Sequence, residues 1–139
     1  MISAQALTQV EFYDVDAMNV AWHGHYVRWL ELGRRELLDS LDYGYARILA
    51  EGWSFPVVDM SLRYLKPAVL GQRLRVRADL VEWENRLVVA YTIDDAADGR
   101  TLCRARSVQV AVRIGNGALS FVMPPTWLDR VNRAIAGGA

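Results

Sequence analysis

The sequence has little of what several classes of protein require. Its single cysteine, Cys103, can form no disulfide within the chain, and one cysteine with two histidines cannot build a Cys-rich zinc site. No apolar run approaches the ~18 residues of a membrane span, and the N-terminus lacks the basic and apolar regions of a signal peptide. We therefore expect a cytoplasmic protein with no metal centre and no membrane span.

The sequence also lacks an excess of positive or negative charge. Sixteen basic and sixteen acidic residues give a formal net charge of zero, which excludes the strongly basic surface of proteins that bind nucleic acid non-specifically. Lys66 is the only lysine, and the other cations are arginines, whose planar fork suits phosphate and carboxylate, although codon bias explains the same skew. Any bound anion must therefore be held by a local cluster of cations.

The chain does have enough apolar material for one core. Hydrophobic residues make up 53% of its 139 residues, and this length predicts a single domain over residues 1–139. Five Trp, six Tyr and three Phe are more aromatic surface than we expect one small core to bury, and a large apolar patch usually marks an interface. We predict a homodimer, with a dimer of dimers as the alternative.

The hydrophobic pattern predicts one long helix among strands. Apolar residues recur at spacings of three and four over residues 25–41, and Gly33 in this stripe would let another element approach closely. A period of two then predicts strands joined by short antiparallel links. The expected strands are 7–13, 55–65, 72–83, 87–94, 101–114 and 118–122; residues 42–52 are a polar connection, and 124–135 form a last helix. The predicted class is α+β, with an antiparallel sheet wrapped around one central helix.

Polar side chains gather just before the long helix. Residues 14–26 contain both histidines and two acids, Asp14 and Asp16. The first turn of a helix has unpaired N–H groups and a partial positive charge, which stabilise a carbonyl oxygen as it becomes an oxyanion. An acid on the preceding loop can activate water or attack directly. The pattern therefore favours acyl transfer from an activated ester or thioester.

This segment resembles the signature of a known family. The run FYDVD at residues 12–16 and the run HGHYVRWLE at residues 23–31 are similar to the hotdog-fold acyl-CoA thioesterases of the 4-hydroxybenzoyl-CoA thioesterase type. The resemblance continues through residues 56–59, 63–68, 81–86 and 124–125, so it covers most of the chain. It implies the hotdog fold and an acyl-CoA thioester hydrolase that needs no cofactor.

The resemblance also implies roles for individual residues. Asp16 matches the catalytic carboxylate, as general base or as nucleophile, whereas Asp14 matches a less critical partner. His23 matches a functional histidine of a bacterial cell-envelope-associated subset, and the backbone N–H groups of His23 and Gly24 are the expected oxyanion donors. Asn19 replaces a usual glycine, but asparagine tolerates left-handed backbone angles.

The expected substrate adds further candidates. Coenzyme A carries phosphates, for which Arg63, Lys66 and Arg86 are the proposed partners, while Arg104 and Arg106 are a second option. The acyl pocket is expected to include Trp22 and Tyr26, whereas Trp29 is expected in the core. For each of these cations the alternative is a solvated surface residue.

Several functional alternatives remain open at this stage. The chain could be a non-catalytic acyl-thioester-binding hotdog dimer, in which Asp16 only forms an Asx turn that stabilises the loop. It could also hydrolyse thioesters of acyl carrier protein. A hotdog dehydratase is not favoured, because the usual His and acid placement is not found. A metal pair of His23 and His25 lacks a convincing third ligand.

Overall fold

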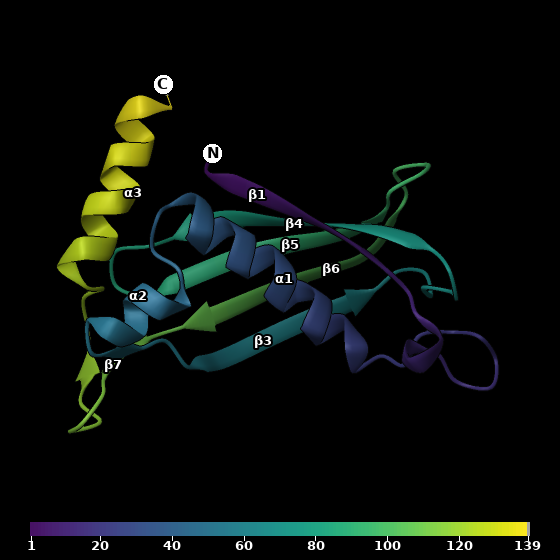
Figure 1. Ribbon diagram of the computed structural model, residues 1–139, viewed down its shortest axis with the longest axis horizontal. Helices are drawn as coiled ribbons and strands as arrows, with labels where there is room; N and C mark the ends of the chain where they lie inside the picture. Colours follow the sequence, from purple (N-terminus) through teal and green to yellow (C-terminus); the bar gives the residue numbers. More distant parts are fainter. Residues whose placement is uncertain (139) are drawn as a thin grey trace.

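One antiparallel sheet curves around one long helix in this computed structural model, which describes residues 1–138 (Figure 1). The five strands follow the order β1-β4-β5-β6-β3, and the helix is α1 (His25–Ser40). The strands are β1 (Ser3–Gln9), β3 (Val57–Tyr64), β4 (Arg73–Glu82), β5 (Leu87–Asp95) and β6 (Thr101–Gln109). The predicted α+β architecture is confirmed.

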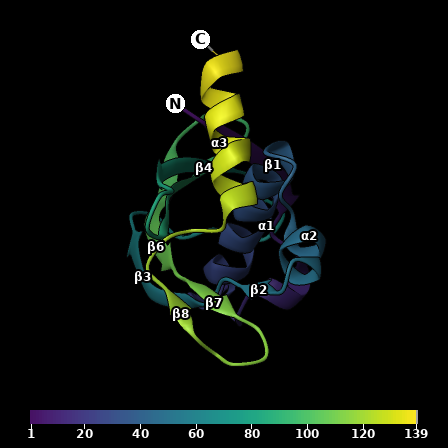
Figure 2. The ribbon, with the colours of Figure 1, turned by 90° about the vertical axis from the view of Figure 1, so that its left-hand side faces the viewer.

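Smaller elements close the two ends of this arrangement. They are the 3-10 turn η1 (Phe12–Asp14), α2 (Tyr45–Ala50), α3 (Pro125–Gly137), and a small sheet of β2 (Trp53–Ser54), β7 (Ala111–Arg113) and β8 (Leu119–Ser120). Viewed from the end, α3 stands in front of the curved sheet (Figure 2). The Trp127 indole N–H donates to the Trp83 carbonyl at 2.9 Å, which fastens α3 to the β4–β5 turn.

Three of the predicted elements need correction. The first strand lies at Ser3–Gln9 rather than 7–13, because residues 12–14 form η1. The connection over 42–52 contains the short helix α2. The strand expected over 101–114 is divided, because the chain leaves β6 after Gln109 and β7 then pairs with β2. In the same way, Phe55 and Pro56 separate β2 from β3.

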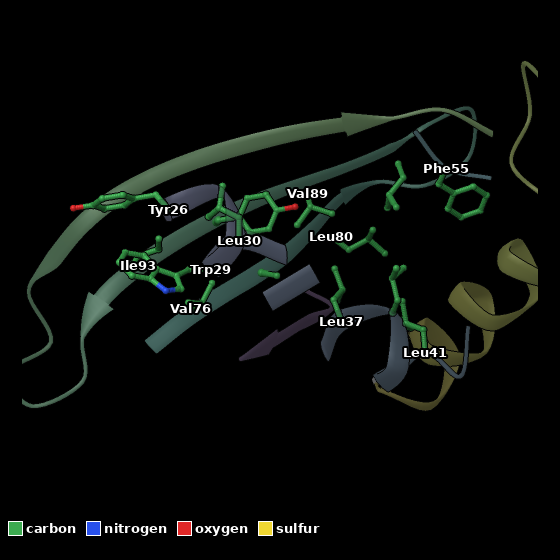
Figure 3. Packing of buried hydrophobic residues seen from close by; sticks show 14 of the residues in the cluster. Tyr26, Trp29, Leu30, Leu37, Leu41, Phe55, Val76, Leu80, Val89 and Ile93 are labelled. Carbon is green, nitrogen blue, oxygen red and sulfur yellow. The ribbon is translucent and has the colours of Figure 1, made fainter. Parts of the chain in front are cut away.

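The core lies between α1 and the inner face of the sheet (Figure 3). Trp29, Leu30 and Leu37 of α1 are fully buried there, which confirms the placement of Trp29 in the core. A Cβ added to Gly33 would lie 2.8 Å from Cγ1 of Val76 on β4. The glycine is therefore needed for the predicted close approach of helix and sheet.

This topology places the start of α1 beside the end of β3. Strand β3 runs antiparallel to β6, with Tyr64 opposite Cys103. The loop before α1 lies at the same end of the sheet, whereas the β4–β5 turn and α3 lie at the opposite end (Figure 1). The segments 15–24 and 64–69, which are far apart in sequence, are thus neighbours.

Candidate active site

The loop before α1 is held in place by backbone pairing. The Trp22 N–H donates to the Asp14 carbonyl at 3.0 Å, and Val15 and Ala21 form an antiparallel bridge. The Ala21 N–H donates to the Ala68 carbonyl at 2.8 Å. Because these bonds tie both arms of the loop to each other and to the segment after β3, the loop holds one position relative to the start of α1.

Asp16 lies at the exposed tip of this loop. Its Oδ1 accepts hydrogen bonds from the backbone N–H groups of Met18 at 2.8 Å and Val20 at 3.4 Å, while Oδ2 has no hydrogen-bond donor among residues 1–138. Asn19 has a φ of 60°, so it occupies the left-handed region that the departure from glycine predicted. Asp16 forms an Asx turn and also keeps one oxygen free, so the two interpretations of this residue are compatible.

Asp14 is buried and has a different environment. Its Oδ2 accepts from the Glu11 N–H at 2.9 Å, and its Oδ1 lies 2.5 Å from a guanidinium nitrogen of Arg28 on α1. The ring of His25 is 3.9 Å from the same oxygen. These contacts engage both carboxylate oxygens, so Asp14 ties η1 to the first turn of α1.

The N-terminus of α1 presents two free backbone donors. The His25 N–H donates to the Trp22 carbonyl at 3.0 Å and the Tyr26 N–H to the His23 carbonyl at 3.4 Å, so the carbonyls before α1 already point along the helix. The N–H groups of His23 and Gly24 consequently point out of the helix end, and within residues 1–138 no acceptor binds them. They are available to an incoming oxyanion.

A cleft of about 260 Å³ opens beside this helix end. His23, Tyr26 and Lys66, three of the predicted site residues, line it. The complete lining is Val20, Ala21, His23, Tyr26, Tyr64, Leu65, Lys66 and Pro67. Asp16 belongs to the loop that leads into the cleft, but its side chain does not contribute to the wall within one chain.

The two aromatic residues proposed for the acyl pocket differ in position. Trp22 is 55% exposed outside the cleft, where its ring lies 5.1 Å from that of His23 and against the α-carbon of Gly24. Tyr26 is only 2% exposed, and its hydroxyl accepts a hydrogen bond from the Ala68 N–H at 2.9 Å. Burial raises the pKa of Tyr26 above its usual value. Tyr26 is therefore a structural wall of the cleft.

Tyr64 is a cleft residue to which the sequence assigned no role. It is 45% exposed, its ring packs edge-to-face on Tyr26 at 4.8 Å, and its hydroxyl donates to the His23 carbonyl at 2.9 Å. The stretch 63–68 was part of the family resemblance, which is the only signal that pointed there. The contact joins residues 41 positions apart, so no local pattern could have revealed it.

The proposed phosphate-binding cations are only partly brought together. Lys66 lines the cleft. Arg63 precedes it, at the end of β3 on the outer face of the sheet, and lies directly opposite Arg104 in the β3–β6 register. Among residues 1–138 neither arginine forms an ion pair with an acidic side chain. Arg86, by contrast, pairs with Glu82 at 3.1 Å in the β4–β5 turn, which lies at the end of the sheet opposite the cleft.

Residues 1–138 contain no group of three or more His, Cys, Asp and Glu side chains arranged to hold a metal ion. The rings of His23 and His25 both contact Trp22, and neither belongs to such a group. None of the helices in this part of the chain combines the length and apolar character needed to cross a membrane.

The chain is similar to known thioesterases over most of its length. Residues 10–131 match the thioesterase-like superfamily. Over 105 residues the chain is 29% identical to YneP of Bacillus subtilis, provisionally named an acyl-CoA thioesterase, with 75% of each chain covered.

Two solved structures share the fold. A DHNA-CoA thioesterase from Staphylococcus aureus has a TM-score of 0.86 at 21% identity, covering 100% of this chain and 97% of that one. A 4-hydroxybenzoyl-CoA thioesterase mutant, complexed with 4-hydroxybenzoyl-CoA, has a TM-score of 0.83 at 18% identity, covering 94% and 99%. The hotdog fold is thereby confirmed, and the chain belongs to the thioesterase-like superfamily, among the acyl-CoA thioester hydrolases.

Proposed function

We propose that the protein hydrolyses acyl-CoA thioesters at the N-terminus of α1, with Asp16 as the reactive carboxylate. The observation that carries this proposal is the pair of free N–H groups, on His23 and Gly24, at the entrance of a 16-residue helix beside a cleft. Donors fixed in this way stabilise negative charge on the thioester oxygen, and loss of one such donor typically costs about 10²–10³ in rate.

The chemistry needs few groups. Either Asp16 takes a proton from water as water attacks the carbonyl carbon, or its free Oδ2 attacks and forms a mixed anhydride that water then hydrolyses. In both routes the C–S bond breaks and the electron pair leaves on the sulfur of coenzyme A. A thiol has a pKa of about 8.5, so the thiolate leaves without strong acid assistance.

The proposal includes a second copy of the chain. Strand β3 is an open sheet edge on which six of its eight residues are exposed, including Val57, Val58 and Tyr64. Such an edge is a template for antiparallel pairing with a two-fold-related copy. That pairing places the start of the partner's β3 beside Tyr64, and therefore brings the β4–β5 end of the partner's sheet to this cleft.

This arrangement explains the scattered cations. The partner's Arg86 comes to the same end of the dimer as Arg63 and Lys66. The opposition of Arg63 and Arg104 is unfavourable without an anion between them, because like charges directly opposite on a sheet repel. We therefore propose that Lys66, Arg63 and the partner's Arg86 bind the phosphates of the substrate.

Substitution of Asp16 tests the mechanism. Asp16→Asn keeps a carbonyl oxygen for the N–H groups of Met18 and Val20, so the loop is expected to persist while kcat/KM falls roughly a thousandfold. The measurement is free-thiol release from a panel of aliphatic and aromatic acyl-CoAs. Asp98→Asn is the matched control, because Asp98 is also an exposed turn carboxylate whose Oδ1 accepts a backbone N–H at 2.9 Å. Full turnover by folded Asp16→Asn would refute the mechanism.

The same panel separates the alternatives. A non-catalytic binding module would bind the thioesters with no thiol release above background in the wild type. A hydrolase of acyl carrier protein thioesters would act on acyl groups attached to that carrier and not on the same groups attached to coenzyme A. The proposal expects saturable release from at least one acyl-CoA, and this release must be lost in Asp16→Asn.

A further inference from the structure

The hydroxyl of Tyr64 binds the carbonyl oxygen of the peptide group between His23 and Gly24. The N–H of this peptide group is one of the two proposed oxyanion donors. The hydroxyl donates to the His23 carbonyl at 2.9 Å, and this carbonyl also accepts the Tyr26 N–H at 3.4 Å. The described chain contains no cis peptide bond, so the Gly24 N–H points away from the His23 carbonyl across the same planar group. Fixing the carbonyl direction therefore fixes the direction of the Gly24 N–H.

Little else restrains this peptide. Gly24 has no side chain, and a Cβ there would lie 2.3 Å from the Trp22 ring, so any other residue would require that exposed ring to move. Glycine permits backbone conformations that other residues do not, which leaves the peptide free to rotate unless a bond holds it. The weak helical bond from Tyr26, at 3.4 Å, is a poor restraint by itself.

Aromatic packing holds the Tyr64 side chain in position to make this hydrogen bond. Its ring packs edge-to-face against Tyr26 at 4.8 Å and lies 6.3 Å from the ring of His23. Partial burial raises the pKa of Tyr64 above its usual value, so the phenol keeps its proton at neutral pH and remains a donor. A carbonyl that accepts a hydrogen bond is also polarised, which makes the N–H of the same amide a better donor.

We infer that Tyr64 is a positioning residue of the oxyanion site, which orients and polarises the His23–Gly24 peptide so that the Gly24 N–H faces the thioester oxygen. This inference rests on the proposed function and extends it to a residue on β3. The hydroxyl acts through the peptide and need not touch the substrate. Its effect is therefore on the transition state, where negative charge develops on the oxygen, rather than on binding.

The variant Tyr64→Phe removes the hydroxyl and keeps the ring packing. Because the Gly24 N–H is misoriented rather than deleted, kcat is expected to fall about tenfold, less than for loss of a whole donor. KM and the dissociation constant for an S-alkyl coenzyme A thioether, which lacks the thioester carbonyl, should stay within about twofold. Tyr45→Phe is the matched control, because Tyr45 is 39% exposed and hydrogen-bonded to Arg34, but lies on α2 away from the cleft.

A spectroscopic signature distinguishes positioning from a merely structural role. In an Asp16→Asn background, a bound thioester with a ¹³C-labelled carbonyl reports the strength of the oxyanion donors through its infrared stretching frequency. Adding Tyr64→Phe should raise that frequency toward the value in solution, and adding Tyr45→Phe should not. An unchanged frequency, an unchanged kcat, or an equal loss of thioether affinity would overturn the inference.

Failure of the proposed function gives a different result. If the wild type releases no thiol from any acyl-CoA, the hydrolase proposal is wrong, and the inference about Tyr64 is wrong with it. If the wild type turns over and Asp16→Asn does not, while Tyr64→Phe keeps full kcat, only the inference about Tyr64 is wrong.

Discussion

The left-handed backbone angle of Asn19 contributes to the stability of the Asp16 loop. Asn19 has a φ of 60°, a region that costs most non-glycine residues about 1–2 kcal/mol and asparagine less. Asn19→Ala is therefore expected to lower the free energy of unfolding by about 1 kcal/mol, and Asn19→Gly to change it by less than ~0.5 kcal/mol. Urea unfolding monitored by circular dichroism measures both. Equal losses in the two variants would show that the asparagine side chain, and not the angle, is what matters.

Cys103 illustrates how burial sets reactivity. The thiol lies in the core, and burial raises its pKa to about 11. We expect no reaction with a disulfide reagent at pH 8 in the folded protein and full reaction in urea, because the thiolate is the reactive form. Since the folded pKa lies above the unfolded value, the associated stability is present below about pH 9 and is lost as the pH rises through 11. Rapid labelling of the native protein at pH 8 would contradict this.

The predictability of individual residues follows the range of their interactions. The Asx turn at Asp16 depends on a few neighbouring residues, so local chemistry was enough to anticipate it, whereas the left-handed Asn19 was anticipated because it replaces a glycine of the resembled family. Tyr26 was proposed for the acyl pocket as an aromatic residue of the motif, and it does line the cleft, yet its hydroxyl accepts a hydrogen bond from Ala68 in a distant segment. Tyr64 lies on another strand, and only the fold could connect it to His23.

At the scale of elements, the contact between α1 and β4 permits a sharp test. In Gly33→Ala the new Cβ would lie 2.8 Å from Cγ1 of Val76, and such overpacking should destabilise the protein by about 1–3 kcal/mol despite the better helix propensity of alanine. Val76→Ala removes that methyl and leaves the Cβ atoms of positions 76 and 78 as the nearest contacts, both at an ordinary 3.6 Å.

A double-mutant cycle over these two positions measures the clash directly. In the Val76→Ala background, Gly33→Ala should cost nothing or stabilise by up to about 1 kcal/mol, because only the propensity gain remains. Thermal and urea unfolding of the four proteins provide the coupling energy. If Gly33→Ala destabilises equally in both backgrounds, the close approach of α1 to β4 is not what requires the glycine.

Elements with a clear period were predicted well, and elements defined by tertiary partners were not. The period of 3.6 in α1 and the strict alternation in β4 reflect one buried face each, so their bounds were close to those observed. The helix α2 buries only Ile48, and six residues cannot display a period. The division of residues 101–114 depends on β2, a two-residue strand that has no recognisable pattern of its own.

At the scale of the molecule, the two sheet edges differ in what they expose. Strand β3 presents Val57, Val58 and Tyr64, whereas β1 presents Leu7 as its exposed large side chain. A homodimer paired through β3 is our proposal for what covers these exposed apolar residues, and it would complete the cleft that starts there. The aromatic surplus in the composition predicts an interface, and the strand order shows which strands, β1 and β3, are the open edges available for it.

A charge placed on β3 tests this dimer. Val58 is 59% exposed, so Val58→Lys leaves the monomer folded, but pairing would bury the new ammonium at the edge. Light scattering should give twice the 15.7 kDa of one chain for the wild type and a single chain for the variant at micromolar concentration. Thiol release should fall with dimer content, because the partner's Arg86 is then absent from the substrate site. Leu7→Lys on β1 is the control and should remain dimeric and active. A monomeric Val58→Lys variant with full activity would show that one chain suffices for the reaction.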